Sequence, residues 1–129
     1  MMIDADAGYL ESHEWAKKQD GNVFTVGLTA YAIEQLGDIV YMELPEAGTE
    51  VIAGEPFGVV ESVKSASDMY APISGTVVEA NTDIPDNPDI LKGDAYDAGW
   101  LIKIEASDPD EFEDLMDNAA YKKFLETEA

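Results

Sequence analysis

The chain has 129 residues, long enough for one domain to bury a hydrophobic core without a metal ion or a disulfide. Its 28 acidic residues face seven lysines and no arginine, which gives a formal net charge of −21 at pH 7. This charge excludes nucleic acid and anionic membranes as favoured partners, because clusters of Lys and Arg are needed to neutralise phosphate groups. The absence of cysteine excludes thiol nucleophiles, Cys–zinc sites and disulfides.

The start of the chain, MMIDADAGYL, is acidic and resembles neither a secretory signal nor an Arg-rich transit peptide. No apolar run in the sequence approaches membrane-spanning length. We therefore expect a cytoplasmic bacterial protein, or a protein of the mitochondrial matrix only if this is a processed chain. The density of like charges favours a monomer that binds partner proteins with basic surfaces.

Residues 23–28 are rich in β-branched and aromatic side chains and predict the first strand. Thr29 is suited to cap a short helix over residues 30–36, which Gly37 would end. Short apolar segments separated by Gly, Pro, Asn and Asp follow, as in a small sandwich or barrel rather than a βαβ sheet. These segments predict strands at 38–44, 57–63, 69–70, 75–80 and 100–104.

After residue 107 the apolar pattern becomes helical. Asp108 can cap a helix, Pro109 suits its first position, and Phe112, Leu115 and Met116 share one face that we expect to pack on the core. A second helical segment is predicted at 119–126. We expect a single domain over residues 1–129, with a β core at about 23–105 and a C-terminal helical region at 108–127.

Two pairs of segments repeat in the same order along the chain. Residues 37–41 and 75–79 both begin with glycine, a polar residue and two apolar β-branched residues, and residues 51–57 match 90–96 position by position. Two related halves predict a flattened barrel with quasi-two-fold symmetry.

Lys64 follows an apolar segment and precedes the small residues at 65–67. This pattern predicts a hairpin with the lysine at its tip, although no Asn-Gly or Asp-Gly marks a tight turn. A lysine at a loop tip is ordinarily only solvated. The residues alone therefore leave two interpretations open: an ordinary surface lysine, or one that carries a group into the active sites of other proteins.

The segment Glu61-Ser62-Val63-Lys64 resembles the lipoylation site of glycine cleavage system H proteins. Further segments resemble the same family in the same order, at 12–15 (SHEW), 26–29 (VGLT), 36–41 (LGDIVY), 71–75 (APISG) and 99–104 (GWLIKI). The resemblance covers most of the chain. Residues 91–97 depart from the family's usual pattern, and the loop at 82–89 is more acidic than the family leads us to expect; this is an expected surface region.

The resemblance implies a mostly β, hybrid barrel-sandwich fold of the lipoyl/biotinyl type, with lipoate attached covalently to Lys64 within the motif Glu61, Ser62 and Val63. It implies a carrier rather than an enzyme, with no catalytic residue. The partners implied are a pyridoxal-phosphate glycine decarboxylase, which loads an aminomethyl group, a tetrahydrofolate-dependent aminomethyltransferase, which removes it, and dihydrolipoamide dehydrogenase, which reoxidises the arm. A lipoate ligase or an octanoyl/lipoyl transferase would modify the lysine.

The same resemblance implies that Ser12, Glu14 and Asp68 line a groove for the loaded arm. Two other functions stay open: an H-like protein that relays lipoate to other complexes, and an unmodified acidic interaction module. The lone histidine, His13, makes a poor metal site and is expected to pack beside Trp15. The acidic residues at 83–94 lack the spacing of a calcium loop, so no metal site is predicted.

Overall fold

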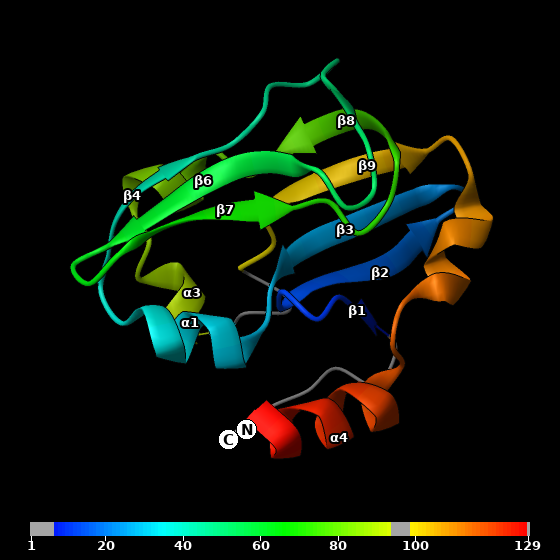
Figure 1. The fold of residues 1–129 in the computed structure, drawn as a ribbon. Coiled ribbons are helices and arrows are strands. Elements are labelled where there is room, and N and C mark those ends of the chain that lie inside the picture. Colours follow the sequence, from blue (N-terminus) through cyan, green and yellow to red (C-terminus); the bar gives the residue numbers. More distant parts are fainter. Residues whose placement is uncertain (1–6, 94–98, 129) are drawn as a thin grey trace.

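The computed structural model describes residues 7–93 and 99–128. They form two antiparallel sheets with helices at the edges (Figure 1). The larger sheet has the strand order β1-β2-β3-β9-β8-β5, and the smaller has the order β4-β6-β7. The larger sheet contains β1 (Gly8–Tyr9), β2 (Glu14–Asp20), β3 (Val23–Leu28), β9 (Ile102–Ala106), β8 (Gly75–Ala80) and β5 (Glu50–Val51). The smaller sheet contains β4 (Ile39–Glu43), β6 (Pro56–Ser62) and β7 (Ala66–Tyr70).

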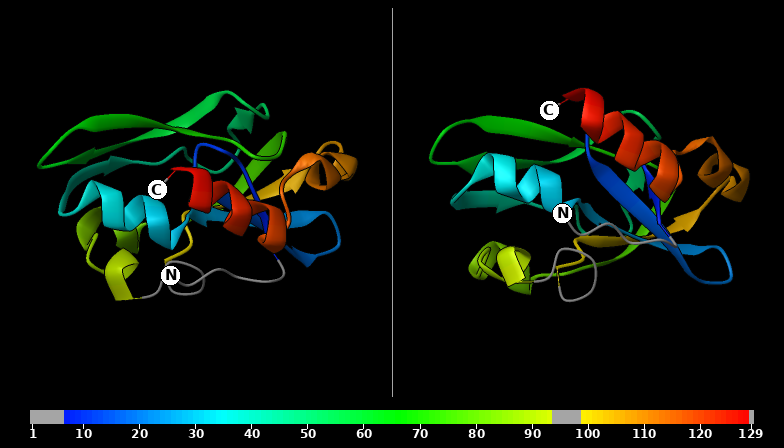
Figure 2. Two further views of the ribbon diagram at one scale, coloured as in Figure 1. Left: turned by 60° about the horizontal axis from the view of Figure 1, so that its bottom comes forward. Right: turned by 90° about the horizontal axis from the view of Figure 1, so that it is seen from below.

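The helices at 30–36 and 90–93 lie toward one end of the sheets, the 3₁₀ helix at 109–114 lies toward the opposite end, and the C-terminal helix lies below β1 (Figure 1). The C-terminal helix runs beside the first helix and β1 (Figure 2). No helix of the described residues is both long and apolar enough to cross a membrane. The helices are α1 (Ala30–Leu36), α2 (Asp83–Asp86), α3 (Ile90–Gly93), the 3₁₀ helix η1 (Pro109–Asp114) and α4 (Asn118–Glu128).

The mostly β, two-sheet architecture confirms the predicted fold class. Three elements have the predicted bounds, namely β3, α1 and β8. Thr29 caps α1 as expected, because its Oγ1 accepts a hydrogen bond from the Ala32 backbone N–H at 3.2 Å. Gly37 ends the helix with a φ of 73°, a left-handed conformation that glycine adopts without a steric penalty.

Other elements differ from the prediction in extent or type. Strand β7 begins at Ala66 rather than at residue 69, and β9 runs to Ala106 rather than to residue 104. Asp108 does cap a helix that begins at Pro109, but this helix is a 3₁₀ turn. The Phe112 ring lies 5.2 Å from the Phe24 ring, so this face packs on the core as predicted.

The predicted repeat has no common backbone structure in its second pair of segments. Val51 belongs to a strand and is followed by a turn, whereas Ile90–Gly93 forms a helix; residues 94–96 lie outside the described residues. The first pair also differs in its glycines, since Gly37 has a positive φ and Gly75 lies in a strand. A Cβ atom at Gly75 would lie 2.1 Å from the Glu105 backbone oxygen. Gly75 therefore permits close packing against β9.

Strands β1, β2 and β5 were not predicted, yet β2 contributes Trp15, the largest fully buried side chain of the described residues. Trp15 is fully buried and lies over Gly27, where a Cβ atom would come within 2.7 Å of the indole ring. The indole N–H donates a hydrogen bond to the Leu28 backbone oxygen at 2.9 Å. The glycine at position 27 thus lets the Trp15 ring lie against β3, and this contact fixes the start of β2.

Candidate functional site

Lys64 lies in a three-residue turn between β6 and β7, and its side chain is exposed. The last strand pair is Glu61 with Ala66, after which the Ser62 backbone N–H donates to the Ser65 backbone oxygen at 2.8 Å. The predicted position of Lys64 at a hairpin tip is thus confirmed.

Ser62 organises this turn without the glycine that tight hairpins usually need. Its hydroxyl oxygen accepts hydrogen bonds from the backbone N–H groups of Lys64 and Ser65, each at 3.2 Å, and the hydroxyl donates to the Ser65 oxygen. A serine side chain that bonds to nearby backbone groups in this way replaces a special backbone conformation. The buried hydroxyl therefore holds the backbone from which Lys64 projects.

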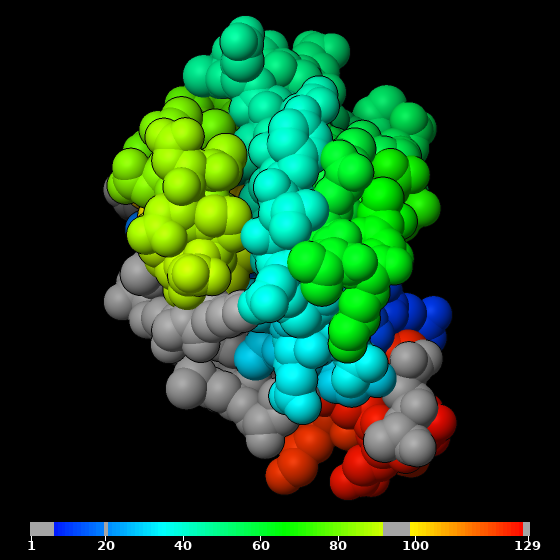
Figure 3. Space-filling view, turned by 90° about the vertical axis from the view of Figure 1, so that its left-hand side faces the viewer, coloured from blue at the N-terminus to red at the C-terminus, as the bar shows by residue number. Residues whose placement is uncertain are grey.

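The turn is also tied to the segment that follows α1. The Val63 backbone N–H donates to the Asp38 backbone oxygen at 3.0 Å. The Lys64 side chain extends over Gly37, where a Cβ atom would lie 3.7 Å from the lysine Cε and 3.9 Å from Nζ. The base of the lysine is thus fixed by hydrogen bonds, while its amine lies at the surface beside the end of α1. Figure 3 shows the green β6–β7 hairpin beside the cyan segment that contains α1 and β4.

A groove of about 180 Å³ begins beside this point and runs between α1, β7 and the turn that precedes β2. Leu36 lines the groove and is the neighbour of Gly37, so the Lys64 side chain stands near one end of it. Its lining includes the three residues predicted for an arm groove, together with His13 and two residues of α1: Ser12, His13, Glu14, Gln35, Leu36 and Asp68. The structure therefore brings Ser12, Glu14 and Asp68 together, although they come from two distant segments.

Glu14 is the buried acid of the groove, with 2% of its surface exposed. One carboxylate oxygen accepts a hydrogen bond from the Tyr70 backbone N–H at 3.1 Å, and the other accepts one from the Ser12 hydroxyl. Burial raises the pKa of Glu14 from 4.5 to about 7, although the hydrogen bonds from Ser12 and Tyr70 oppose this shift. Near neutral pH this carboxyl group is therefore expected to be present in both its protonated and its ionised form.

Ser12 and Asp68 are exposed, in contrast to Glu14. Asp68 lies two residues beyond Ala66 on β7, or roughly 7 Å along the strand from the base of the Lys64 turn. The groove thus has one buried carboxyl group, that of Glu14, and one exposed carboxyl group, that of Asp68. Among the described residues, no group of three or more His, Asp and Glu side chains is arranged to hold a metal ion.

The expected packing of His13 beside Trp15 stays a prediction, and the structure shows ring contacts of His13 with other aromatic residues. The imidazole ring lies 4.7 Å from the Tyr31 ring, and its Nδ1 lies 2.8 Å from the Tyr121 hydroxyl oxygen. The sequence carried no signal for this contact, because the two residues are 108 positions apart. His13 lines the groove between two residues that the resemblance did identify, Ser12 and Glu14.

A two-sheet β domain that presents an exposed lysine on a hairpin turn has the architecture of the lipoyl/biotinyl-type carrier domains. Comparison with known proteins identifies the family within this class. The family model described as "Glycine cleavage H-protein" matches residues 7–128. The chain therefore belongs to the glycine cleavage H-protein family.

Individual relatives agree with this result over nearly the whole length of the chain. The glycine cleavage system H protein of Anaeromyxobacter sp. strain K is 51% identical over 98% of each chain. That of Escherichia coli O7:K1 is 46% identical over 98% of each chain. The crystal structure of a glycine cleavage system H protein from Mycobacterium marinum superimposes with a TM-score of 0.84 and 36% identity, again over 98% of each chain.

Proposed function

We propose that this chain is a lipoyl-lysine carrier of the glycine cleavage system, with lipoate attached to Lys64 as an amide. The observation that carries the proposal is the placement of Lys64 at an exposed, hydrogen-bonded hairpin tip beside a groove that contains a buried carboxyl group. We also propose that residues 1–129 act as a single carrier domain rather than as an enzyme.

The residues around Lys64 fit an attached lipoyl chain. The turn is held by Ser62 and by the Asp38 backbone, so modification of the exposed amine requires no change in the strands. When bound, lipoate would supply a disulfide that accepts an aminomethyl unit and carries it between active sites. Acylation also removes the positive charge of the lysine, which makes this end of the molecule more acidic.

The protein contributes attachment, delivery and shelter. A tether keeps the reactive group at roughly millimolar effective concentration once a partner has docked. Water releases formaldehyde and ammonia from an aminomethyl group held on sulfur, so a groove that excludes water protects the cargo. The groove between α1 and β7 lies within reach of Lys64 and serves this purpose in the proposal.

Ser12, Glu14 and Asp68 would receive the amine of the loaded arm. A positive charge beside a carboxyl group favours the ionised form and lowers its pKa. The pKa of Glu14 is about 7 when the groove is empty, so an ammonium group beside it would shift Glu14 toward the carboxylate form. Entry of the loaded arm is therefore expected to release a proton from Glu14 near neutral pH.

Docking would use the surface around the lysine. Val63 and Val40 are 66% and 62% exposed, and Tyr41 is exposed beside them on β4, which pairs with β6. This apolar area lies on a molecule with 28 acidic residues. We propose that glycine decarboxylase, the aminomethyltransferase, dihydrolipoamide dehydrogenase and the lipoate-attaching enzyme each approach it with a basic rim around an apolar centre.

The test is glycine-dependent exchange of bicarbonate by a glycine decarboxylase supplied with the lipoylated chain. The proposal predicts exchange with the wild type and with Lys18→Ala, which removes an exposed lysine on β2. It predicts none with Lys64→Ala. A lipoylated chain that supports no exchange would instead favour the relay of lipoate to other complexes.

A further inference from the structure

His13 has a backbone conformation that is unusual for its side chain. Its φ of 75° makes it a non-glycine residue with a positive φ, and it closes the turn between β1 and β2. The His13 backbone N–H donates to the Leu10 oxygen at 2.9 Å, and the Leu10 N–H donates to the Glu14 oxygen at 2.9 Å. In hairpins with this hydrogen-bond pattern, the residue with positive φ, here His13, is ordinarily glycine. Histidine adopts this conformation more often than most non-glycine residues but less readily than glycine, so contacts with its surroundings are expected to stabilise it.

The imidazole ring is held by α4. The Tyr121 hydroxyl donates a hydrogen bond to Thr29 Oγ1 at 2.8 Å. Because its proton is used there, the Tyr121 oxygen accepts the hydrogen bond from His13 Nδ1, also at 2.8 Å. Thr29 is the cap of α1, and its backbone N–H donates to the His13 backbone oxygen at 2.9 Å. His13 is thus fixed through both its backbone and its ring.

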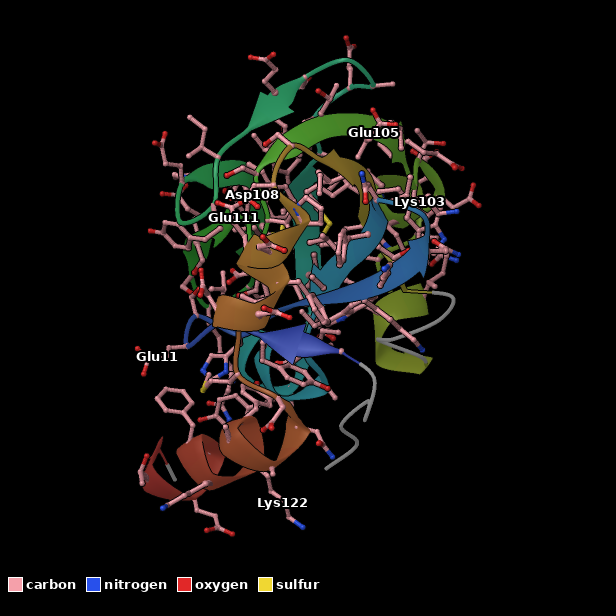
Figure 4. The ribbon with its side chains drawn as sticks, turned by 90° about the vertical axis from the view of Figure 1, so that its right-hand side faces the viewer. Glu11, Lys103, Glu105, Asp108, Glu111 and Lys122 are labelled. Atoms are coloured by element: carbon pink, nitrogen blue, oxygen red, sulfur yellow. The ribbon has the colours of Figure 1, made fainter. Side chains whose placement is uncertain are left out.

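Tyr121 is itself immobilised. Its side chain is fully buried and stacks on the Tyr9 ring with a centroid distance of 4.3 Å and an interplanar angle of 5°. Figure 4 shows α4 below β1. Glu11 marks the turn between β1 and β2, and Lys122 points away from the sheets. One face of α4 therefore reaches the turn, and the other face is free of it.

The turn that these contacts hold carries two residues of the groove, since His13 stands between Ser12 and Glu14. We propose that His13 is a positioning residue for the arm groove, fixed by Tyr121, so that helix α4 sets the placement of Ser12 and Glu14. This inference rests on the proposed carrier function. It assigns the C-terminal helix a part in retaining the cargo, in addition to its packing on β1.

The first measurement is the rate of formaldehyde and ammonia release from the lipoylated, aminomethyl-loaded chain. Tyr121→Phe keeps the stacked ring and removes the hydroxyl, and His13→Asn keeps a residue that tolerates positive φ and removes the ring. Both variants are expected to release the cargo about 2- to 10-fold faster, the range that one hydrogen bond supplies. Lys122→Ala, on the far face of α4, is the control and is expected to release it at the wild-type rate.

His13→Gly separates the role of the ring from that of the backbone. Glycine adopts a positive φ without strain, so this variant is expected to keep the chain reversal and the stability of the fold, while the turn loses its attachment to Tyr121 and becomes looser. If the ring positions the groove, His13→Gly releases the cargo as fast as His13→Asn. Release of the cargo by His13→Gly at the wild-type rate would overturn the inference.

The second measurement uses the unmodified chain and is independent of lipoylation. The Glu14 side chain is titrated by NMR in the wild type, Tyr121→Phe and His13→Gly. The other titratable groups that line the groove are His13 and Asp68, which must be followed in the same titration. A loosened turn admits water to Glu14, so its midpoint is expected to fall from about 7 toward 4.5 in both variants. An unchanged midpoint in both variants contradicts the inference, and it leaves the attachment of lipoate to Lys64 unaffected.

Discussion

The Glu14 carboxylate accepts a hydrogen bond from the Tyr70 backbone N–H at 3.1 Å, across 56 positions of the sequence. This bond joins the start of β2 in the larger sheet to the end of β7 in the smaller one. The same strand β7 begins next to the Lys64 turn. The buried carboxyl group and the exposed amine are therefore placed relative to each other by one strand rather than by a flexible loop.

Glu14→Gln is expected to change how stability depends on pH. The pKa of Glu14 is raised in the folded state, so the favourable contribution of its protonated form is complete below 4.5 and is lost as pH rises toward 7. The wild type should lose roughly 3 kcal/mol of unfolding free energy relative to Glu14→Gln over that interval. Urea unfolding of both proteins at several pH values measures the difference. Parallel curves would show that Glu14 titrates normally.

Glu14→Gln is also expected to release the cargo of the loaded arm faster than the wild type, because the variant cannot provide a carboxylate to the bound amine. The amide occupies nearly the same volume and can still bond to Ser12 and the Tyr70 backbone. The measurement is amine release at pH 7 and at pH 8, where more of the wild-type Glu14 is ionised. The ratio of the two rates should increase with pH; equal rates at both pH values would remove Glu14 from cargo retention.

Ser62→Ala is expected to destabilise the Lys64 turn. It removes the acceptor for two backbone N–H groups at a position with only 8% exposure, and such a loss costs about 1–3 kcal/mol. The rate of lipoylation by a lipoate ligase should also fall, because the lysine is presented less rigidly. The control is Ser65→Ala, at an exposed position of the same turn. Similar effects of the two variants would show that the Ser62 hydroxyl has no special part.

Gly27→Ala is expected to lower stability by about 1–3 kcal/mol or more, the usual cost of overpacking. The added methyl group would lie 2.7 Å from the Trp15 ring, which is buried and cannot move toward solvent. Urea unfolding measures the stability, and the tryptophan emission spectrum reports displacement of the ring. A stable variant with an unchanged spectrum would contradict the account of how β2 is anchored.

Much of the fold follows from local sequence. Strand β3 and helix α1 were predicted with their observed bounds because β-branched residues, a threonine cap and a terminal glycine act within a few residues of one another. Strand β2 was missed because Glu14–Asp20 begins with three adjacent buried residues, the first of them a glutamate, and continues with Lys, Lys and Gln, so it has no alternating pattern. It is a strand because β3 pairs with it and Trp15 packs on Gly27.

The sequence indicated which residues form the candidate site, but not how the folded chain buries them or which residues contact them. The resemblance to H proteins pointed to Lys64, Ser12, Glu14 and Asp68, and the structure places the last three in one groove beside the first. The burial of Glu14 and the contact between His13 and Tyr121 arise from segments that meet only in the folded chain. No local pattern carries that information.

The most direct test of the central claim is the intact mass of the chain isolated from its native source. If residue 64 bears the swinging arm, the wild type is heavier than its sequence by one lipoyl group, and Lys64→Ala has the mass of the unmodified sequence. A wild-type chain at its unmodified mass, or an unchanged gain in the Lys64→Ala variant, would contradict the carrier function proposed here.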